Sequence, residues 1–123
     1  MIAADSEIQM TIAQIEHGII QKNRLLDEKN NEYVRLVEKR AEDEKNWRVA
    51  YHNALLNLTD EPVTVRIDLV KGNREVAKLK MKFEISLGIE RACLESIKDI
   101  REKLAVYRSF LSYKKAENFQ GGG

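Results

Sequence analysis

The chain has 123 residues, of which 33% are charged and 43% hydrophobic, and its formal net charge is +1. It contains one proline and six glycines, three of which close the chain. This composition disfavours many-turned β folds and a large enzyme with a buried cleft, and it favours an elongated helical protein with a large charged surface. The lone Cys93 excludes an intrachain disulfide and provides no thiol cluster for zinc.

The first predicted element is a helix over residues 7–58. Ser6 and Gln9 match a capping box, in which each side chain satisfies a backbone N–H group of the first turn. The apolar line drifts along the helix, because 3.6 residues per turn do not match a seven-residue repeat. It runs through Ile8, Ile12, Ile15, Ile19, Leu26 and Tyr33, then through Val37, Ala41, Arg48, Tyr51, Leu55 and Leu58. As one helix this segment would be about 78 Å long, a length typical of a coiled coil.

Residues 63–87 are open to two interpretations. Apolar and polar residues alternate from Val63 to Leu87, a period typical of a β-hairpin. We favour a short helix over 63–71, ended by Gly72 in the left-handed conformation. A hairpin would leave roughly half of the first helix without a partner, and the Lys, Glu, Leu and Met residues beyond Gly72 favour helix. The alternative is a helix–β-hairpin–helix chain similar to prefoldin.

A second long helix is predicted over residues 73–116, with Asn73 as its cap. Its core seam alternates steps of three and four, as in a coiled coil. The seam consists of Val76, Leu79, Phe83, Ser86, Glu90, Cys93, Ile97, Ile100, Leu104, Tyr107 and Leu111. We expect residues 117–123 to form a disordered tail.

The predicted fold is therefore all-α, a long antiparallel helical hairpin with a short connecting helix, forming a single domain over residues 1–116. A lone hairpin covers too little of its apolar surface, so we expect a homo-oligomer. The apolar residues left off the main seam are Leu25, Val34, Leu56, Leu87 and Leu94.

Residues with catalytic chemistry are scarce. His17 and His52 show no metal-ligand spacing, and no glycine-rich phosphate loop or nucleophile elbow is present. Glu90 lies on the apolar seam, where a carboxylate needs a partner, and we expect it to pair with Arg40 or Arg48. We predict no enzyme activity, no catalytic or metal site and no cofactor.

The electrostatic feature that could carry a function is a basic cluster over residues 66–82, where six Lys or Arg residues outnumber two acids. The candidate nucleic-acid-binding residues are Arg66, Lys71, Arg74, Lys78, Lys80 and Lys82. On one helix Lys71, Arg74, Lys78 and Lys82 would form one stripe that could follow a phosphate backbone without reading sequence. Tyr107, Tyr113 and Phe119 are candidates for stacking on bases. The alternative is that these charges only solvate the outer face of a coiled coil.

The second half of the chain resembles the UvsY-like phage recombination mediators, and also small helical proteins of phages from Gram-positive bacteria. The resemblance covers about 45 residues and is carried by the runs Gly72–Leu79, Ala92–Lys98 and Arg108–Leu111. It implies a helical homo-oligomer that binds single-stranded DNA and helps a recombinase to replace the single-strand-binding protein. Lys71, Arg74, Lys78 and Lys82 occupy the segment where that family has basic residues.

We therefore hypothesise a non-enzymatic recombination mediator in the cytoplasm of a bacterial host. No secretory signal is apparent, and no segment approaches the roughly 20 apolar residues of a membrane helix, so we expect no membrane partner. The main alternative is a coiled-coil scaffold or a prefoldin-like chaperone. A third interpretation is a phage protein that binds and blocks a host protein.

Overall fold

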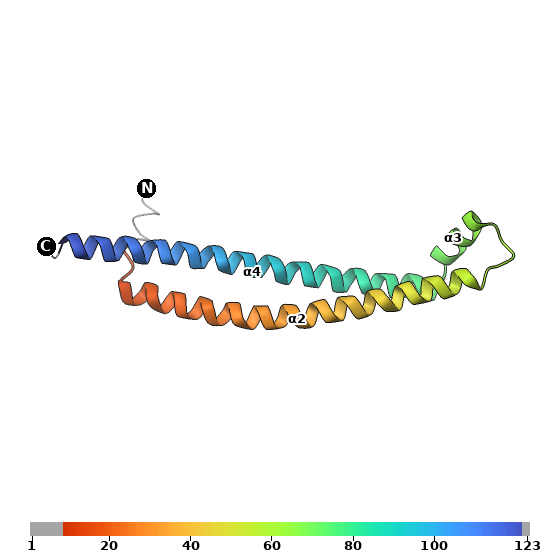
Figure 1. Ribbon diagram of the computed structural model, residues 1–123, viewed down its shortest axis with the longest axis horizontal. Coiled ribbons are helices and arrows are strands. Elements are labelled where there is room, and N and C mark those ends of the chain that lie inside the picture. Colours follow the sequence, from red (N-terminus) through yellow and green to blue (C-terminus); the bar gives the residue numbers. More distant parts are fainter. Residues whose placement is uncertain (1–8, 122–123) are drawn as a thin grey trace. The chain divides into compact units, whose positions relative to one another are not determined.

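The computed structural model describes residues 9–121, and those residues form three helices and no strand. The helices are α2 (Ile12–Leu56), α3 (Val63–Lys71) and α4 (Arg74–Gly121) (Figure 1). The two long helices pack against each other. The all-α prediction is therefore confirmed, and the alternative with a β-hairpin over 63–87 is wrong.

α2 begins with a capping box that the sequence analysis placed elsewhere. The backbone N–H of Thr11 donates to Oε1 of Gln14 over 2.8 Å, and the N–H of Gln14 donates to Oγ1 of Thr11 over 3.1 Å. This reciprocal pair is the S/T-x-x-E/Q arrangement that satisfies two free N–H groups. The predicted partner Ser6 and the predicted start at residue 7 lie outside the described residues. At its other end α2 stops at Leu56, before the predicted residue 58.

α3 has the predicted bounds, but its last residue does not adopt the predicted conformation. Gly72 has φ −82° and ψ −6°, which is right-handed, so the expected left-handed cap is wrong. The N–H of Gly72 donates to the carbonyl of Asp68, and the N–H of Asn73 donates to the carbonyl of Val70. These bonds satisfy the carbonyls at the end of α3 without a left-handed residue.

α4 starts where the sequence predicted. Oδ1 of Asn73 accepts hydrogen bonds from the N–H groups of Glu75 and Val76, over 2.9 and 3.1 Å, so the predicted Asn73 cap is confirmed. An N-cap of this kind supplies an acceptor to the free donors of the first turn. The helix continues to Gly121, and residues 117–121, which the sequence analysis assigned to a tail, are helical.

The alternation of residues 63–87 has a helical explanation. In a helix, residues two apart lie on different faces, so an alternating pattern puts part of its apolar residues in solvent. Val63, Leu69, Met81 and Ile85 are each at least half exposed, whereas Val70 is buried. The strand-like period therefore reflects exposed apolar side chains rather than a half-buried sheet.

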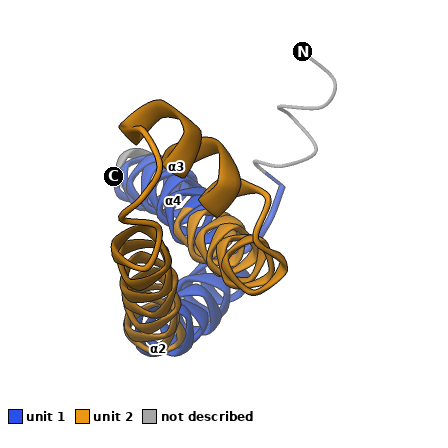
Figure 2. Ribbon diagram, turned by 90° about the vertical axis from the view of Figure 1, so that its right-hand side faces the viewer, with its two compact units in different colours: residues 1–31, 95–123 blue, residues 32–94 orange. Residues whose placement is uncertain are grey.

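The chain divides into two compact units (Figure 2). The first consists of residues 1–31 and 95–123, and among its described residues Ile15, Ile97, Ile100 and Leu104 are buried. Gly18 is also buried, and a Cβ atom at this position would lie 3.0 Å from the ring of Tyr107. The absence of a side chain at residue 18 thus allows the tyrosine ring to pack closely against α2.

The second unit consists of residues 32–94. It includes α3 and the parts of α2 and α4 that lead to and from it. Its buried residues are both apolar and polar. The apolar ones are Val70, Val76 and Cys93, and the polar ones are Asp43, Ser86 and Glu90. This unit therefore contains the buried charges of the described chain and the whole of the basic cluster.

Candidate functional site

A polar layer crosses the interior of the second unit. Asp43 of α2 is only 2% exposed, and its carboxylate accepts a hydrogen bond from Oγ of Ser86 on α4. Nζ of Lys39 lies 3.1 and 3.0 Å from the two carboxylate oxygens, and Nζ of Lys82 lies 3.9 Å away. Burial by itself raises the pKa of Asp43, but the hydrogen bonds from Ser86 and Lys39 and the two positive charges bring it below its ordinary value. Asp43 is therefore held as a carboxylate.

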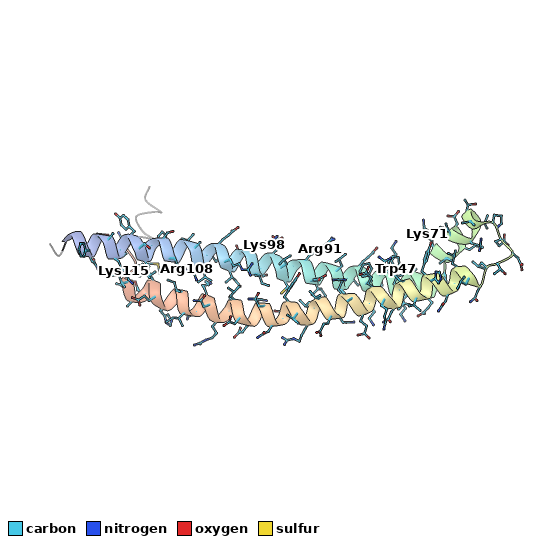
Figure 3. All side chains as sticks on the ribbon, in the orientation of Figure 1. Trp47, Lys71, Arg91, Lys98, Arg108 and Lys115 are labelled. Atoms are coloured by element: carbon cyan, nitrogen blue, oxygen red, sulfur yellow. The ribbon has the colours of Figure 1, made fainter. Side chains whose placement is uncertain are left out.

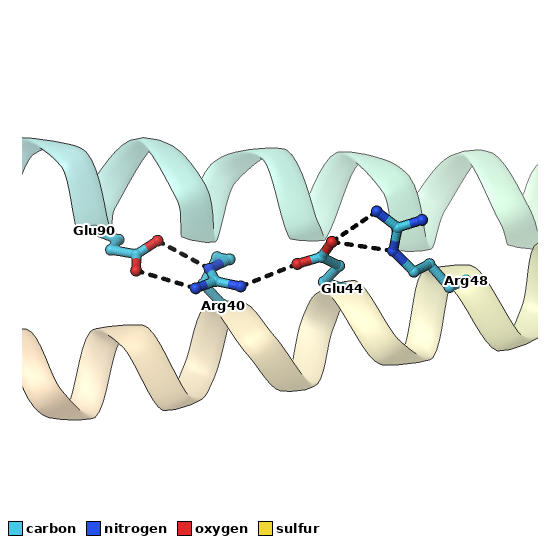
Figure 4. A network of polar contacts seen from close by, with 4 residues as sticks. All are labelled: Arg40, Glu44, Arg48 and Glu90. Atoms are coloured by element: carbon cyan, nitrogen blue, oxygen red, sulfur yellow. Dashed lines mark hydrogen bonds and ion pairs between the residues drawn. The ribbon is translucent and has the colours of Figure 1, made fainter.

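A second polar contact joins the same two helices one turn away (Figure 4). Nε and Nη2 of Arg40 donate to the two carboxylate oxygens of Glu90, over 2.9 and 3.4 Å. Nη1 of Arg40 also donates to Glu44 over 3.0 Å, and Glu44 accepts two further bonds from Arg48. The predicted partner of Glu90 is thus Arg40, whereas Arg48 pairs within its own helix. The hydrogen bond with Glu90 raises the pKa of Arg40, so this guanidinium is charged at every physiological pH.

The interhelical contacts show that α2 and α4 run antiparallel in this unit. Arg40 meets Glu90, Asp43 meets Ser86, and Trp47 meets Phe83. Residue numbers rise by three and four on α2 while they fall by four and three on α4. This is the layering of an antiparallel coiled coil.

Trp47, the sole tryptophan, lies between α2 and α4 (Figure 3). Its ring stacks on Phe83 with 5.5 Å between centroids and 6° between planes, and Tyr51 meets it edge-on at 6.3 Å. Two cations lie over the ring: Cζ of Arg48 at 5.3 Å and Nζ of Lys80 at 5.8 Å from its centroid. Cation–π contacts at these distances are attractive.

An open groove of about 980 Å³ lies beside this aromatic cluster. The three helices of the unit contribute to it: Trp47, Tyr51 and His52 come from α2, Lys71 from α3, and Lys80 from α4. The remaining lining residues are Arg48, Val49, Asn53, Val76, Ala77, Met81 and Glu84. The groove therefore combines an apolar, aromatic floor with three cations and one carboxylate.

The structure separates the predicted basic stripe into parts. Lys71 belongs to α3 and Arg74 begins α4, so the expected single stripe of Lys71, Arg74, Lys78 and Lys82 is wrong. The break at Gly72 and Asn73 changes the direction of the chain between them. Lys71 and Lys80 reach the groove, Lys82 lies by Asp43, and Arg74 and Lys78 are exposed on α4. Arg66 of α3 is half-buried, and its Nε finds no hydrogen-bond acceptor among the described residues.

The predicted seam residues are more deeply buried on α4 than on α2. On α4, Val76, Ser86, Glu90, Cys93, Ile97, Ile100 and Leu104 are buried, and Leu79, Phe83, Tyr107 and Leu111 are half-buried. On α2 the expected seam residues Ala41 and Arg48 are exposed, while Asp43 is buried and Trp47 half-buried. The stacking candidates Tyr113 and Phe119 are 56% and 86% exposed and do not belong to the groove.

Sequence reasoning did not identify Asp43, Trp47 or Tyr51 as site residues. A signal was present, because Trp47 and Tyr51 are four apart and thus share a helix face. Asp43 occupies a position four before Trp47 on that same face, where an acid is uncommon. Following the aromatic residues rather than Ala41 and Arg48 would have placed the seam of α2 correctly.

The chain was compared with family models, curated proteins and solved structures, and none of them matches it. Within residues 9–121, none of the helices has an apolar stretch long enough to cross a bilayer.

Proposed function

We propose that this protein binds single-stranded DNA in the groove of the second unit. The observation that carries the proposal is that one groove holds the aromatic rings of Trp47 and Tyr51 together with the cations Lys71 and Lys80. Proteins that bind single strands without sequence preference combine aromatic platforms for the bases with positive charge along the backbone. The apolar floor offers contact to bases, and the lysines offer contact to phosphates.

The proposal assigns separate roles to these side chains. Trp47 and Tyr51 contact the bases, and Lys71 and Lys80, which come from different helices, neutralise successive phosphates. Arg48 is the weaker candidate, since its guanidinium already pairs with Glu44. For the same reason Lys82, beside the buried Asp43, is not assigned a phosphate.

The resemblance to UvsY-like mediators extends this proposal. A homo-oligomer would place several such grooves on one strand, and multivalent binding raises affinity well beyond that of a single site. The strand held in this way would be presented to a recombinase in exchange for the single-strand-binding protein.

The test uses the intrinsic fluorescence of Trp47, which reports on the groove itself because the chain has no other tryptophan. Titration with oligo-dT at low salt should quench Trp47 and raise the anisotropy of a labelled strand. Lys71→Glu/Lys80→Glu should weaken binding about tenfold or more and reduce the slope of log affinity against log salt by about 1.4, since each single-strand phosphate contributes about 0.7.

The matched control carries the same change of charge in the first unit, as Lys98→Glu/Lys115→Glu (Figure 3). It should bind within about twofold of the wild type if the groove is the site. Absence of binding by the wild type at low salt, or equal weakening in both variants, would refute the proposal.

A protein-interaction scaffold is the second candidate function. It is favoured by the apolar residues left exposed on the second unit, including Val49, Met81 and Ile89, each of them about half exposed. An apolar surface of this kind is typical of an interaction site. A chain that self-associates but leaves oligo-dT unbound would support the scaffold instead of the DNA-binding protein.

A further inference from the structure

The outer face of α4 carries a second heptad pattern, distinct from the core seam that faces α2. Its residues also follow one another by alternate steps of four and three, so they form one stripe along a single helix. We call this stripe the outer seam. It consists of Arg74, Lys78, Met81, Ile85, Gly88, Ala92, Glu95 and Asp99, all of which are exposed.

The middle of the outer seam is apolar. Met81 and Ile85 are 59% and 55% exposed, and a Cβ atom added at Gly88 would meet nothing within 4 Å. On the solvent side of an amphipathic helix these positions are normally polar. Large side chains thus occupy one half of this apolar stretch, and the small residues Gly88 and Ala92 occupy the other.

The ends of the outer seam carry opposite charges. Arg74 and Lys78 precede the apolar stretch, and Glu95 and Asp99 follow it. A two-fold axis that reverses one helix against a copy of itself places each basic end against an acidic end. We propose that the outer seam binds a second copy of this chain, with the two α4 helices antiparallel.

One register satisfies both the charges and the packing. When Ile85 lies over Gly88 of the second copy, Met81 lies over Ala92, Lys78 faces Glu95, and Arg74 faces Asp99. Large residues then meet small ones, as in well-packed cores. Among the described residues, Glu95 and Asp99 have only exposed neighbours on their own helix as ion partners, Lys98 and Lys103, and such pairs are weak enough to exchange.

The residues beside the outer seam favour the same arrangement. Glu84 and Arg91 are exposed, and no ion pair joins either of them to another residue in the described part of the chain. In the antiparallel register Glu84 of each copy lies beside Arg91 of the other. A parallel pair would instead place like charges together, Arg74 against Arg74 and Asp99 against Asp99, which is unfavourable.

This inference does not depend on the proposed DNA binding. Of the outer-seam residues only Met81 also lines the groove. Variants at the charged ends of the seam therefore change self-association and leave the groove intact. Each proposal can thus be refuted independently of the other.

The experiment is sedimentation velocity of the full chain over a concentration series, with charge-reversed variants. The wild type should sediment as a dimer. Arg74→Glu/Lys78→Glu and Glu95→Lys/Asp99→Lys should each raise the dissociation constant about tenfold or more, because each creates like-charge pairs at both ends. An equimolar mixture of the two variants should recover the dimer, since every reversed end then meets an opposite charge, and so should the chain that carries all four substitutions.

Gly88→Arg provides a packing variant that is harmless to the single chain. The site is open in the structure and arginine favours helix more than glycine does, so the isolated chain keeps its fold. The same side chain would displace Ile85 of the second copy and should yield monomers. A wild-type chain that is monomeric throughout the series, or charge variants that sediment as the wild type does, would overturn the proposal. Dimers that persist in Gly88→Arg would also overturn it.

Discussion

The hydroxyl of Ser86 on α4 donates a hydrogen bond to the buried carboxylate of Asp43 on α2. This contact links the two long helices through the polar layer in the interior of the second unit. A buried acid costs free energy unless it is fully partnered, and Asp43 receives donors from Ser86 and Lys39. The stability of this unit should therefore depend on the protonation state of Asp43.

Acidification should destabilise the protein by protonating Asp43. Its pKa in the folded chain lies below the ordinary value, so folding favours the carboxylate form. The resulting stabilisation is complete above a pH of about 5, begins to fall near the ordinary aspartate pKa of about 4, and is lost as the pH drops further through the lower pKa of the folded chain. Glu44, whose pKa is lowered by hydrogen bonds from Arg48, contributes in the same direction. Urea unfolding followed by circular dichroism at pH 7, 5 and 3.5 measures the loss.

The matched variant for this prediction is Asp43→Asn. It should be less stable than the wild type at pH 7, and the difference should shrink as the pH falls below about 4, because the wild type then loses the stabilisation that comes from its carboxylate. Removing the donor with Ser86→Ala should cost about 1–3 kcal/mol at pH 7, because the buried carboxylate loses a hydrogen bond and keeps Lys39 as its donor. Parallel stability curves for the wild type and Asp43→Asn across this range would contradict the assignment.

The Arg40–Glu90 contact should show coupling between its two residues. Glu90→Ala should lower Tm, since Arg40 loses its interhelical acceptor and keeps the acceptor Glu44 on its own helix. Once Arg40→Ala is present, the further loss of Glu90 should cost much less. A double-mutant cycle by thermal unfolding measures this difference, and additive effects of the two substitutions would show that the contact contributes nothing.

Gly18 and Gly88, which lie inside the two long helices, should respond oppositely to alanine. Gly88→Ala fills open space on a helix and should stabilise the chain by about 1 kcal/mol through helix propensity. Gly18→Ala brings a methyl group 3.0 Å from the Tyr107 ring, so close contact should cancel or reverse that gain. The comparison uses urea unfolding of both variants, and Tyr107→Leu should restore the gain at Gly18. Equal stabilisation at both positions would show that the Tyr107 ring moves aside freely.

The start of α4 should depend on the side chain of Asn73. Asn73→Ala removes the acceptor for two backbone N–H groups and should cost about 1 kcal/mol of unfolding free energy, whereas Asn73→Asp retains an acceptor and should cost little. Urea unfolding distinguishes the two. Equal losses for alanine and aspartate would indicate that capping does not limit the stability of this end.

The fold could be predicted from the sequence in those segments where several signals agreed. The helix over 63–71 and the cap at Asn73 were predicted because helix formers, a long seam and a capping residue outweighed a strand-like alternation. The conformation of Gly72 could not be predicted, because it depends on the hydrogen bonds that lead directly into α4. The sequence predicted two candidate partners for Glu90, Arg40 and Arg48. The choice of Arg40 follows from the register of the two helices, which the sequence alone does not determine.

The candidate site was less predictable than the fold. The basic cluster was visible as a local excess of charge. Which of its residues lie at the groove, beside the buried Asp43 or on the exposed face of α4 depends on the turn between Lys71 and Arg74. Asp43 was not expected inside the unit, since an acid carries no apolar signal. Its burial follows from Ser86 and Lys39, whose contribution appears only when the two helices are in register.

The absence of a side chain at Gly18 also restricts how the first unit assembles. If α2 and α4 slid past each other by one heptad, Tyr107 would meet Thr11 or Leu25 instead of a glycine, and the ring could not approach as closely. A shift of helix register is therefore sterically unfavourable in this unit. In the other unit it is unfavourable because it would separate the buried Asp43 from its partner Ser86. Each unit thus contains its own safeguard against misalignment, based on different chemistry.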